Sequence, residues 1–181
     1  AFVGSFFAAN AQAPYVSVHN INYVSPANLA ACNDSSAYWG DTVRTRGIVV
    51  VDGNLSEVAS GSVPGGSRPF IFIVDTANGG LAGNFNGIEV MGTNNAGTLS
   101  PPPAFTQVIA GDIVEITGTI NSFNNSIQIS LLNANSFSVV GSTTAPTSIV
   151  APLGSLNDAN RVNNMVTGEQ YQGSFVKFQN V

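Results

Sequence analysis

Charged side chains are scarce in this sequence. Asp, Glu, Lys and Arg make up 8% of the 181 residues, against about a quarter in ordinary soluble domains. Five residues are basic, and the formal net charge is -5. Because proteins bind phosphate backbones largely through clustered lysines and arginines, this composition argues against nucleic acid as a partner.

Cysteine and histidine are rarer still. The single cysteine, Cys32, excludes an intrachain disulfide framework. A thiol nucleophile needs a nearby base, and His19 is the one histidine available. Asp112 and Glu115 are three positions apart on a predicted strand, so they point to opposite faces and cannot act as a catalytic pair. No zinc-ligand spacing or Gly-rich phosphate loop is present. We therefore expect a protein that is not an enzyme and has no cofactor or metal.

Apolar and small residues are abundant in place of charged ones. Hydrophobic residues are 44% of the chain, with 19 glycines and 9 prolines. This composition excludes a highly charged disordered chain and suffices for a core. No apolar run is long enough to span a bilayer.

The clearest local pattern lies in residues 111–132, which predict a β-hairpin. Val114 and Ile116 share one face of the first strand, Asn124-Asn125 is typical of a turn, and apolar alternation resumes at 127–131. The opening phrase Gly-Asp-x-Val-x-x-x-Gly occurs at both 40–47 and 111–118. Its final glycine predicts a bulge or bend in each strand.

The remaining alternation predicts an all-β, five-stranded barrel with an extra N-terminal strand or arm and an extra C-terminal strand. Barrel strands are expected at 41–51, 70–74, 87–92, 113–117 and 127–131, with a sixth short strand at 136–140 and flanking strands at 15–24 and 174–181. Other segments are predicted as a loop or short helix (26–38), loops (53–67 and 75–86), an extended connector without helix (94–105), and a short helix or turn (153–166). The expected divisions are 1–13, 14–38, the barrel at 39–141, a linker at 142–167 and a C-terminal strand at 168–181.

Four phrases carry a resemblance to a known family: Ser-Ser-Ala-Tyr-Trp-Gly-Asp-Thr-Val-Arg-Thr-Arg-Gly (35–47), Phe-Ile-Phe-Ile-Val-Asp (70–75), Gly-Asp-Ile-Val-Glu-Ile-Thr-Gly-Thr-Ile (111–120) and Gly-Glu-Gln-Tyr-Gln-Gly-Ser-Phe-Val (168–176). The chain resembles OB-fold modules of secreted and cell-surface bacterial proteins, which are found attached to extracellular nucleases and in multi-repeat surface proteins of the Bacteroidetes type. The resemblance implies an OB-fold barrel, export to the cell exterior or surface, and a following module that begins at 168–181.

The N-terminal residues 1–13 have two interpretations. Ala11-Gln12-Ala13 fits a cleavage site, which would make this segment the remnant of a signal peptide. If the segment is retained, it forms an apolar arm that could add as a strand to a neighbouring subunit. The assembly residues expected at the two termini are Phe2, Val3, Phe6, Phe7, Phe175 and Phe178.

OB-folds often bind single-stranded nucleic acid by stacking its bases on aromatic side chains over a basic groove. The ligand-binding candidates are Arg44, Arg46, Arg68, Phe70, Phe72 and Phe123. In the alternative interpretation, the alternating phenylalanines fill the barrel and the arginines are solvated.

Two further patterns concern oxygen-rich loops. The loop at 75–80 has ligand types that calcium prefers, but its single carboxylate favours an Asx turn. Thr42 and Thr76 lie in Asp-Thr-apolar sequences that are similar to Bacteroidetes O-glycosylation sites.

Two functions remain open. In the first, the chain is a non-catalytic secreted structural module, such as a filament subunit, whose partner is another copy bound through edge strands. In the alternative, it is an accessory domain of a larger secreted enzyme that binds glycan or single-stranded nucleic acid. Exposed aromatics on the barrel face would favour the alternative.

Overall fold

The computed structural model describes residues 12–59, 67–77, 83–92, 103–133 and 135–179. The predicted apolar arm, with Phe2, Val3, Phe6 and Phe7, lies outside these residues. No helix of the described ranges is long and apolar enough to cross a membrane.

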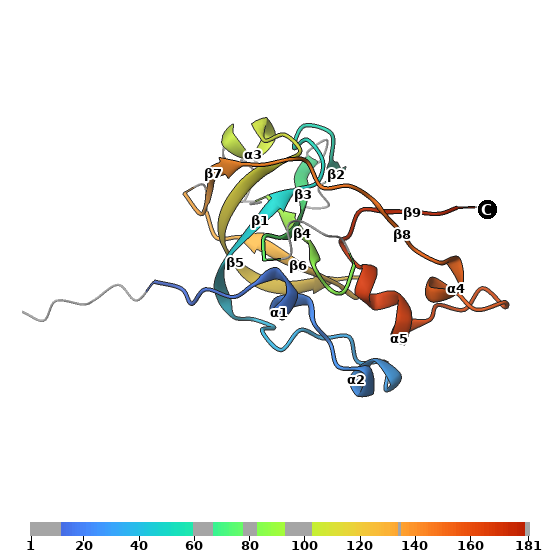
Figure 1. Ribbon diagram of the computed structural model, residues 1–181. Helices are drawn as coiled ribbons and strands as arrows, with labels where there is room; N and C mark the ends of the chain where they lie inside the picture. Colours follow the sequence, from blue (N-terminus) through green and yellow to red (C-terminus); the bar gives the residue numbers. More distant parts are fainter. Residues whose placement is uncertain (1–11, 60–66, 78–82, 93–102, 134, 180–181) are drawn as a thin grey trace, which may run out of the picture.

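Five strands close into a barrel, which confirms the predicted all-β OB-fold. The barrel strands are β1 (Thr42–Val49), β3 (Ser67–Asp75), β4 (Gly87–Met91), β5 (Asp112–Phe123) and β6 (Ser126–Leu131). Going around the ring the order is β1-β3-β4-β6-β5, and β5 pairs again with β1 to close it. The β4–β6 pair is parallel and the other pairs are antiparallel. Two short strands extend the sheet (Figure 1): β2 (Glu57–Ala59) beside β3, and β7 (Phe137–Ser142) beside β5.

Alternation of side chains produces the core. On β5 every second residue from Val114 to Ile120 is buried, as the hairpin pattern predicts. The turn residues Asn124 and Asn125 have φ of 50° and 64°, which suits a two-residue hairpin and which asparagine tolerates. Inward-facing side chains from all five strands, each at most 1% exposed, include Val43, Ile71, Ile88, Val114 and Ile129.

The glycines that end the repeated phrase lie inside the barrel. A Cβ on Gly47 would lie 2.7 Å from Cδ1 of Ile73, and one on Gly118 would lie 2.5 Å from Cγ2 of Ile129. Larger side chains at these two positions would overlap neighbouring isoleucines. The two glycines therefore leave room for the core. The predicted bulge at each of them is wrong, because the pairing of β1 with β5 runs through both glycines without a shift of register.

The predicted N-terminal strand at 15–24 is wrong over most of its length. The segment forms α1 (Val18–Asn22), in which the Ser17 side chain accepts a hydrogen bond from the Asn20 N–H. Val18, Ile21 and Asn22 are buried, which is the spacing of one helical face. Tyr15 alone makes a β-bridge, to Arg44 of β1. The second short helix, α2 (Pro26–Ala30), confirms the expectation of a loop or helix in this region.

The predicted extended connector at 94–105 is also wrong at its end, where α3 (Pro103–Gln107) forms. Proline is tolerated in the first turn of a helix because its missing N–H is not needed there. Phe105 of α3 is fully buried and its ring packs on that of Phe137 at 5.1 Å. The helix, which lies between β4 and β5 in the sequence, thereby covers part of the barrel core.

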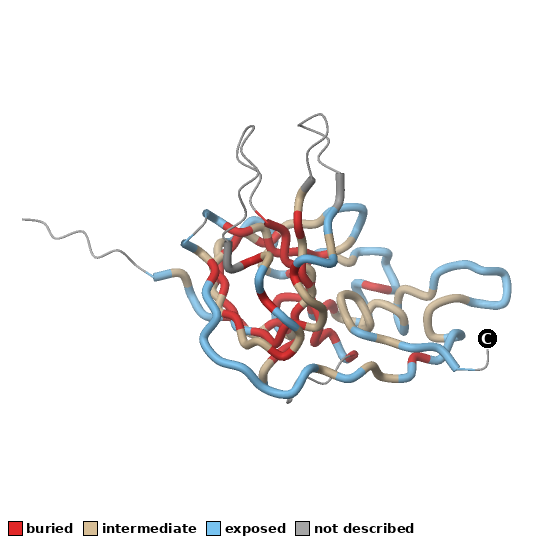
Figure 2. The backbone as a smooth tube through the Cα atoms, turned by 90° about the horizontal axis from the view of Figure 1, so that it is seen from above, coloured by how far each residue is buried: buried red, intermediate tan, exposed pale blue. Residues whose placement is uncertain are grey.

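Residues 142–179 form a smaller, more exposed region beside the barrel, seen in Figure 2 as mostly tan and blue. It contains β8 (Ile149–Val150), α4 (Leu153–Leu156), α5 (Met165–Gly168), the 3-10 helix η1 (Glu169–Tyr171) and β9 (Val176–Lys177). β8 and β9 pair in parallel as a separate two-stranded sheet. That a further module begins at 168 stays a prediction.

Candidate ligand-binding face

The outer face of the barrel presents ordered rows of side chains. Across the strands, Phe72 is opposite Glu89, Glu89 is opposite Gln128, and Gln128 is opposite Asn121. A second row begins two residues away, where Phe70 is opposite Met91. Because side chains opposite one another point the same way, each row emerges on one side of the sheet. We define the outer face by Phe70, Phe72, Glu89, Asn121 and Gln128, of which Gln128 is buried at 6% exposure and the other four are half-buried.

Phe70 and Phe72 lie on the outer side of β3. Both are half-buried, whereas Ile71 and Ile73 between them are fully buried. The interpretation in which the alternating phenylalanines fill the barrel is therefore wrong for this strand. Their rings pack edge to face with centroids 5.6 Å apart and an interplanar angle of 85°. This contact fixes both rings as one apolar platform.

Phe123 lies apart from this platform. It is 68% exposed beside the turn between β5 and β6. It follows Asn121 by two positions, so it lies on the same outer side of β5 but at the tip of the hairpin.

The three candidate arginines lie on the outer side of their strands, and two of them lie near a carboxylate. Arg46 donates to Glu115 Oε2 at 2.8 Å, with side chains 45% and 28% exposed. Burial raises the pKa of Glu89, and the positive charge of Arg68 opposes that rise. Arg44, half-buried on β1, lies opposite Thr117 of β5. Arg46 and Arg68 are therefore balanced by nearby carboxylates, and the three arginines do not form a continuous basic groove.

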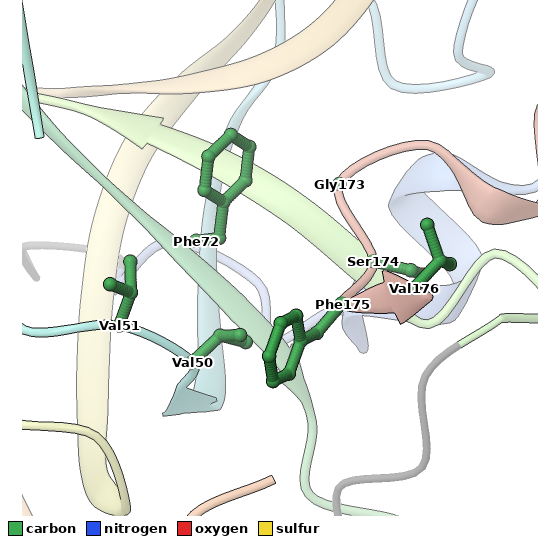
Figure 3. Close-up of a pocket in the computed structure, with 7 residues that line it drawn as sticks. All are labelled: Val50, Val51, Phe72, Gly173, Ser174, Phe175 and Val176. Atoms are coloured by element: carbon green, nitrogen blue, oxygen red, sulfur yellow. The ribbon is translucent and has the colours of Figure 1, made fainter. Parts of the chain in front are cut away.

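A pocket of about 390 Å³ lies between the barrel and the C-terminal region (Figure 3). Phe72, Val50 and Val51 line it from the barrel. Gly173, Ser174, Phe175 and Val176 line it from the chain before β9. Phe175, predicted as an assembly residue, thus contributes to the wall beside the aromatic platform, while it remains 45% exposed. The sequence alone gave no signal for this pairing, because it depends on the path of the C-terminal chain.

Asp75, the single carboxylate of the predicted oxygen-rich loop, has a structural role; residues 78–80 of that loop lie outside the described residues. Asp75 is 1% exposed and its Oδ1 accepts from the Ala77 N–H at 2.8 Å, which confirms the Asx turn. Its Oδ2 accepts from the His19 N–H at 3.0 Å, so the carboxylate also ties α1 to the barrel. Among the described residues, no group of three or more His, Cys, Asp or Glu side chains is placed to hold a metal ion.

The other candidate residues are dispersed. Phe178 is 41% exposed beyond β9. Thr42 is half-buried, with its Oγ1 3.4 Å from Oγ1 of Thr119. Thr76 is half-buried in the Asx turn. O-glycosylation of either threonine stays a prediction.

Comparison with known proteins finds remote likenesses among solved structures, three of which follow. No family model and no curated protein matches the chain. The second OB-fold domain of replication protein A from Methanococcus maripaludis is 14% identical, with TM-score 0.35, over 58% of this chain and 89% of that one. Aspartyl tRNA synthetase from Entamoeba histolytica is 15% identical, with TM-score 0.38, over 70% and 23% of the two chains. A putative aspartyl-tRNA synthetase from Leishmania major Friedlin is 10% identical, with TM-score 0.37, over 88% and 27%.

The match therefore spans about a quarter of each synthetase's length. Likeness at this level carries no argument about function. The assignment of the OB-fold comes from the closed strand order and the parallel β4–β6 pair.

Proposed function

We propose that this protein is a non-catalytic module that binds an uncharged, extended ligand, a glycan, on its outer face. The observation that supports this most is the outward platform of Phe70 and Phe72. The row that begins at Phe72 ends in the half-buried Asn121, the amide nearest to the surface, while Gln128 beside it is 6% exposed. The faces of sugar rings carry C–H groups that pack on aromatic rings, and their hydroxyls exchange hydrogen bonds with side-chain amides. OB-folds bind oligosaccharides as well as oligonucleotides on this side of the barrel.

The charges on the outer side of the barrel strands, within and beside the outer face, favour a neutral ligand over a nucleic acid. Glu115 pairs with Arg46, and Glu89 lies within the electrostatic reach of Arg68. Affinity for single strands rests on a positively charged groove as well as on stacking. Because the chain has a formal net charge of -5, long-range electrostatic repulsion would oppose the binding of a polyanion.

Calorimetric titration of the chain with neutral oligosaccharides, acidic oligosaccharides and single-stranded DNA tests this function. We expect binding of a neutral oligosaccharide, weakened about tenfold or more by Phe70→Ala or Phe72→Ala because each removes part of the platform. Phe178→Ala serves as the control, since Phe178 lies beyond β9 and should leave affinity unchanged. Salt-dependent binding of DNA, with no sugar bound, would contradict the proposal.

A second candidate is assembly between copies, and the C-terminal region favours it. The β8–β9 sheet has two strands, and large apolar side chains around it are exposed by 41% to 54%: Val150, Leu153, Phe175 and Phe178. Strands at the edge of a small sheet can pair with another chain. Sedimentation of the chain over a range of concentrations tests this; a monomer at all concentrations, together with absence of fibres by electron microscopy, would contradict it.

Both candidates rest on export of the protein to the cell surface or medium, which the sequence resemblance implies. Detection of the native protein in cell-surface and culture fractions tests the location.

A further inference from the structure

The chain from Glu169 to Val176 lies against the barrel, and we refer to it as the strap. Four hydrogen bonds connect it to the loop before β4 and to the β5–β6 hairpin. They are Phe85 N to Gln170 O (2.9 Å), Gly83 N to Ser174 Oγ (3.0 Å), Ile127 N to Gln172 Oε1 (3.1 Å) and Gln172 Nε2 to Asn125 O (3.2 Å). The strap is thus held by polar contacts to two separate parts of the barrel.

Two glycines allow the strap to lie directly on β4. A Cβ on Gly87 would lie 2.4 Å from the carbonyl oxygen of Gly173, and one on Gly173 would lie 2.7 Å from the carbonyl carbon of Gly87. Gly173 also has φ of +65°, which glycine adopts without strain. Val74, opposite Gly87 and on the same side of β3 as Phe72, is fully buried. The strap therefore covers the end of the outer face next to Phe72.

A pair of carboxyl groups lies where the strap begins. Glu169 Oε1 and Asp34 Oδ2 are both buried and have no hydrogen-bond partner. Asp34 follows α2, which packs against α5 immediately before Glu169. Neither helix carries a charged residue, so Asp34 is the charge that acts on Glu169 in the described part of the chain.

Burial, together with the negative charge of Asp34, raises the pKa of Glu169 from 4.5 to about 7. Ionisation therefore costs more in the docked strap than in a strap released to solvent. Burial of Glu169 is therefore most favourable when its carboxyl group is protonated, becomes less favourable as the pH rises from about 4.5 to about 7, and stays so above that range.

We propose that the strap is a built-in cover of the outer face, docked while Glu169 is protonated beside Asp34 and released when Glu169 ionises. Release exposes Val74, Gly87 and the adjoining side of Phe72. The consequence for ligand binding, tighter binding at higher pH, rests on the function proposed above; the release itself does not.

Two-dimensional NMR of the full chain between about pH 5 and pH 8.5 tests release without any ligand. We expect the amide signals of Gly83, Phe85 and Ile127 to change with a midpoint near 7, because their partners belong to the strap. Glu169→Gln keeps the shape but cannot ionise, so its signals should stay in the docked position throughout. Signals that do not titrate in the wild type, or that titrate alike in Glu169→Gln, would overturn the proposal.

Gly173→Ala provides a released reference, because its Cβ would overlap the backbone of Gly87 and Ile88. Gly154→Ala is the matched control, since a Cβ there meets nothing within 4 Å. The Gly173→Ala variant should show the released signals at every pH, and Gly154→Ala should titrate like the wild type. Docked signals in Gly173→Ala would contradict the described contact.

Titration with the neutral oligosaccharide separates the two proposals. We expect the wild type to bind about three to ten times more tightly at pH 8 than at pH 6, since the group is partly exposed and its full effect is screened. Gly173→Ala should bind tightly at both. Equal affinity of the wild type and Gly173→Ala at pH 6 would overturn the strap as a cover. Absence of binding in all variants, with NMR release intact, would overturn the glycan function alone.

Discussion

Phe72 of β3 and Phe175 of the strap line one pocket of about 390 Å³, although they come from the barrel and from the far end of the chain. The outer face of the OB-fold is therefore bounded by a wall that the barrel does not supply. Whether that wall is docked determines how much of Phe72 a ligand can reach.

The inward orientation of Ile71 and the outward orientation of Phe70 on β3 give one prediction. Ile71→Ala should lower the free energy of unfolding by about 2–5 kcal/mol, because Ile71 is fully buried. Phe70→Ala, which removes a larger but half-buried side chain from the outer side, should cost distinctly less. Urea denaturation of both variants checks the order; the reverse order would contradict the described orientation of the strand.

Gly118 lies where neighbouring residues leave no room for a side chain. Gly118→Ala should destabilise the fold by about 1–3 kcal/mol, because the new Cβ would lie 2.5 Å from both Ile129 Cγ2 and the Ser130 carbonyl oxygen. Guanidinium denaturation measures the difference. Gly154→Ala, in open space, should lose less than about 0.5 kcal/mol, so an equal loss in both variants would contradict the close approach.

Asp75 should matter for stability rather than for metal binding. Asp75→Ala leaves the N–H groups of His19 and Ala77 without their acceptor, which should cost about 1–3 kcal/mol. Asp75→Asn keeps an acceptor oxygen and should cost less. Thermal unfolding in the presence of calcium and of chelator checks both points; a large stabilisation by calcium that Asp75→Ala abolishes would contradict the structural role.

Glu169 should make stability depend on pH. Because the pKa of Glu169 is raised from 4.5 to about 7 in the folded chain, ionisation should remove stability progressively across that range and leave it constant above. The full difference is at most about 3 kcal/mol, and screening of this partly exposed group reduces it to about 1 kcal/mol. Unfolding curves of the wild type and Glu169→Gln should therefore diverge as the pH rises. Parallel pH dependence would contradict this.

Local patterns were enough to predict the barrel. Alternation placed the five strands, and the Asn124-Asn125 turn gave the hairpin. Alternation could not give the face of β3, because Phe70 and Phe72 are as apolar as Ile71 and Ile73. Whether the rings pointed in or out depended on the space inside the closed barrel.

The failures were at short elements and long-range contacts. Apolar alternation predicted a strand at 15–24, whereas the Ser17 cap and the buried spacing of Val18, Ile21 and Asn22 produced a five-residue helix. The strap depends on contacts of Gln172, Gly173 and Ser174 with distant residues, which no local pattern encodes. The proximity of Glu169 to Asp34 could not be predicted either, because the two residues are far apart in the sequence.

The parallel pairing of β4 with β6 also has a kinetic consequence. The β5–β6 hairpin joins neighbours in the sequence and can form within microseconds, but the contacts that complete the ring join β1 to β5 and β4 to β6 across long intervening segments. Closing such loops costs entropy before the contacts repay it, so folding should take milliseconds to seconds. During that interval the inner faces of β1 and β4 are open to solvent, and to newly made copies of the same chain.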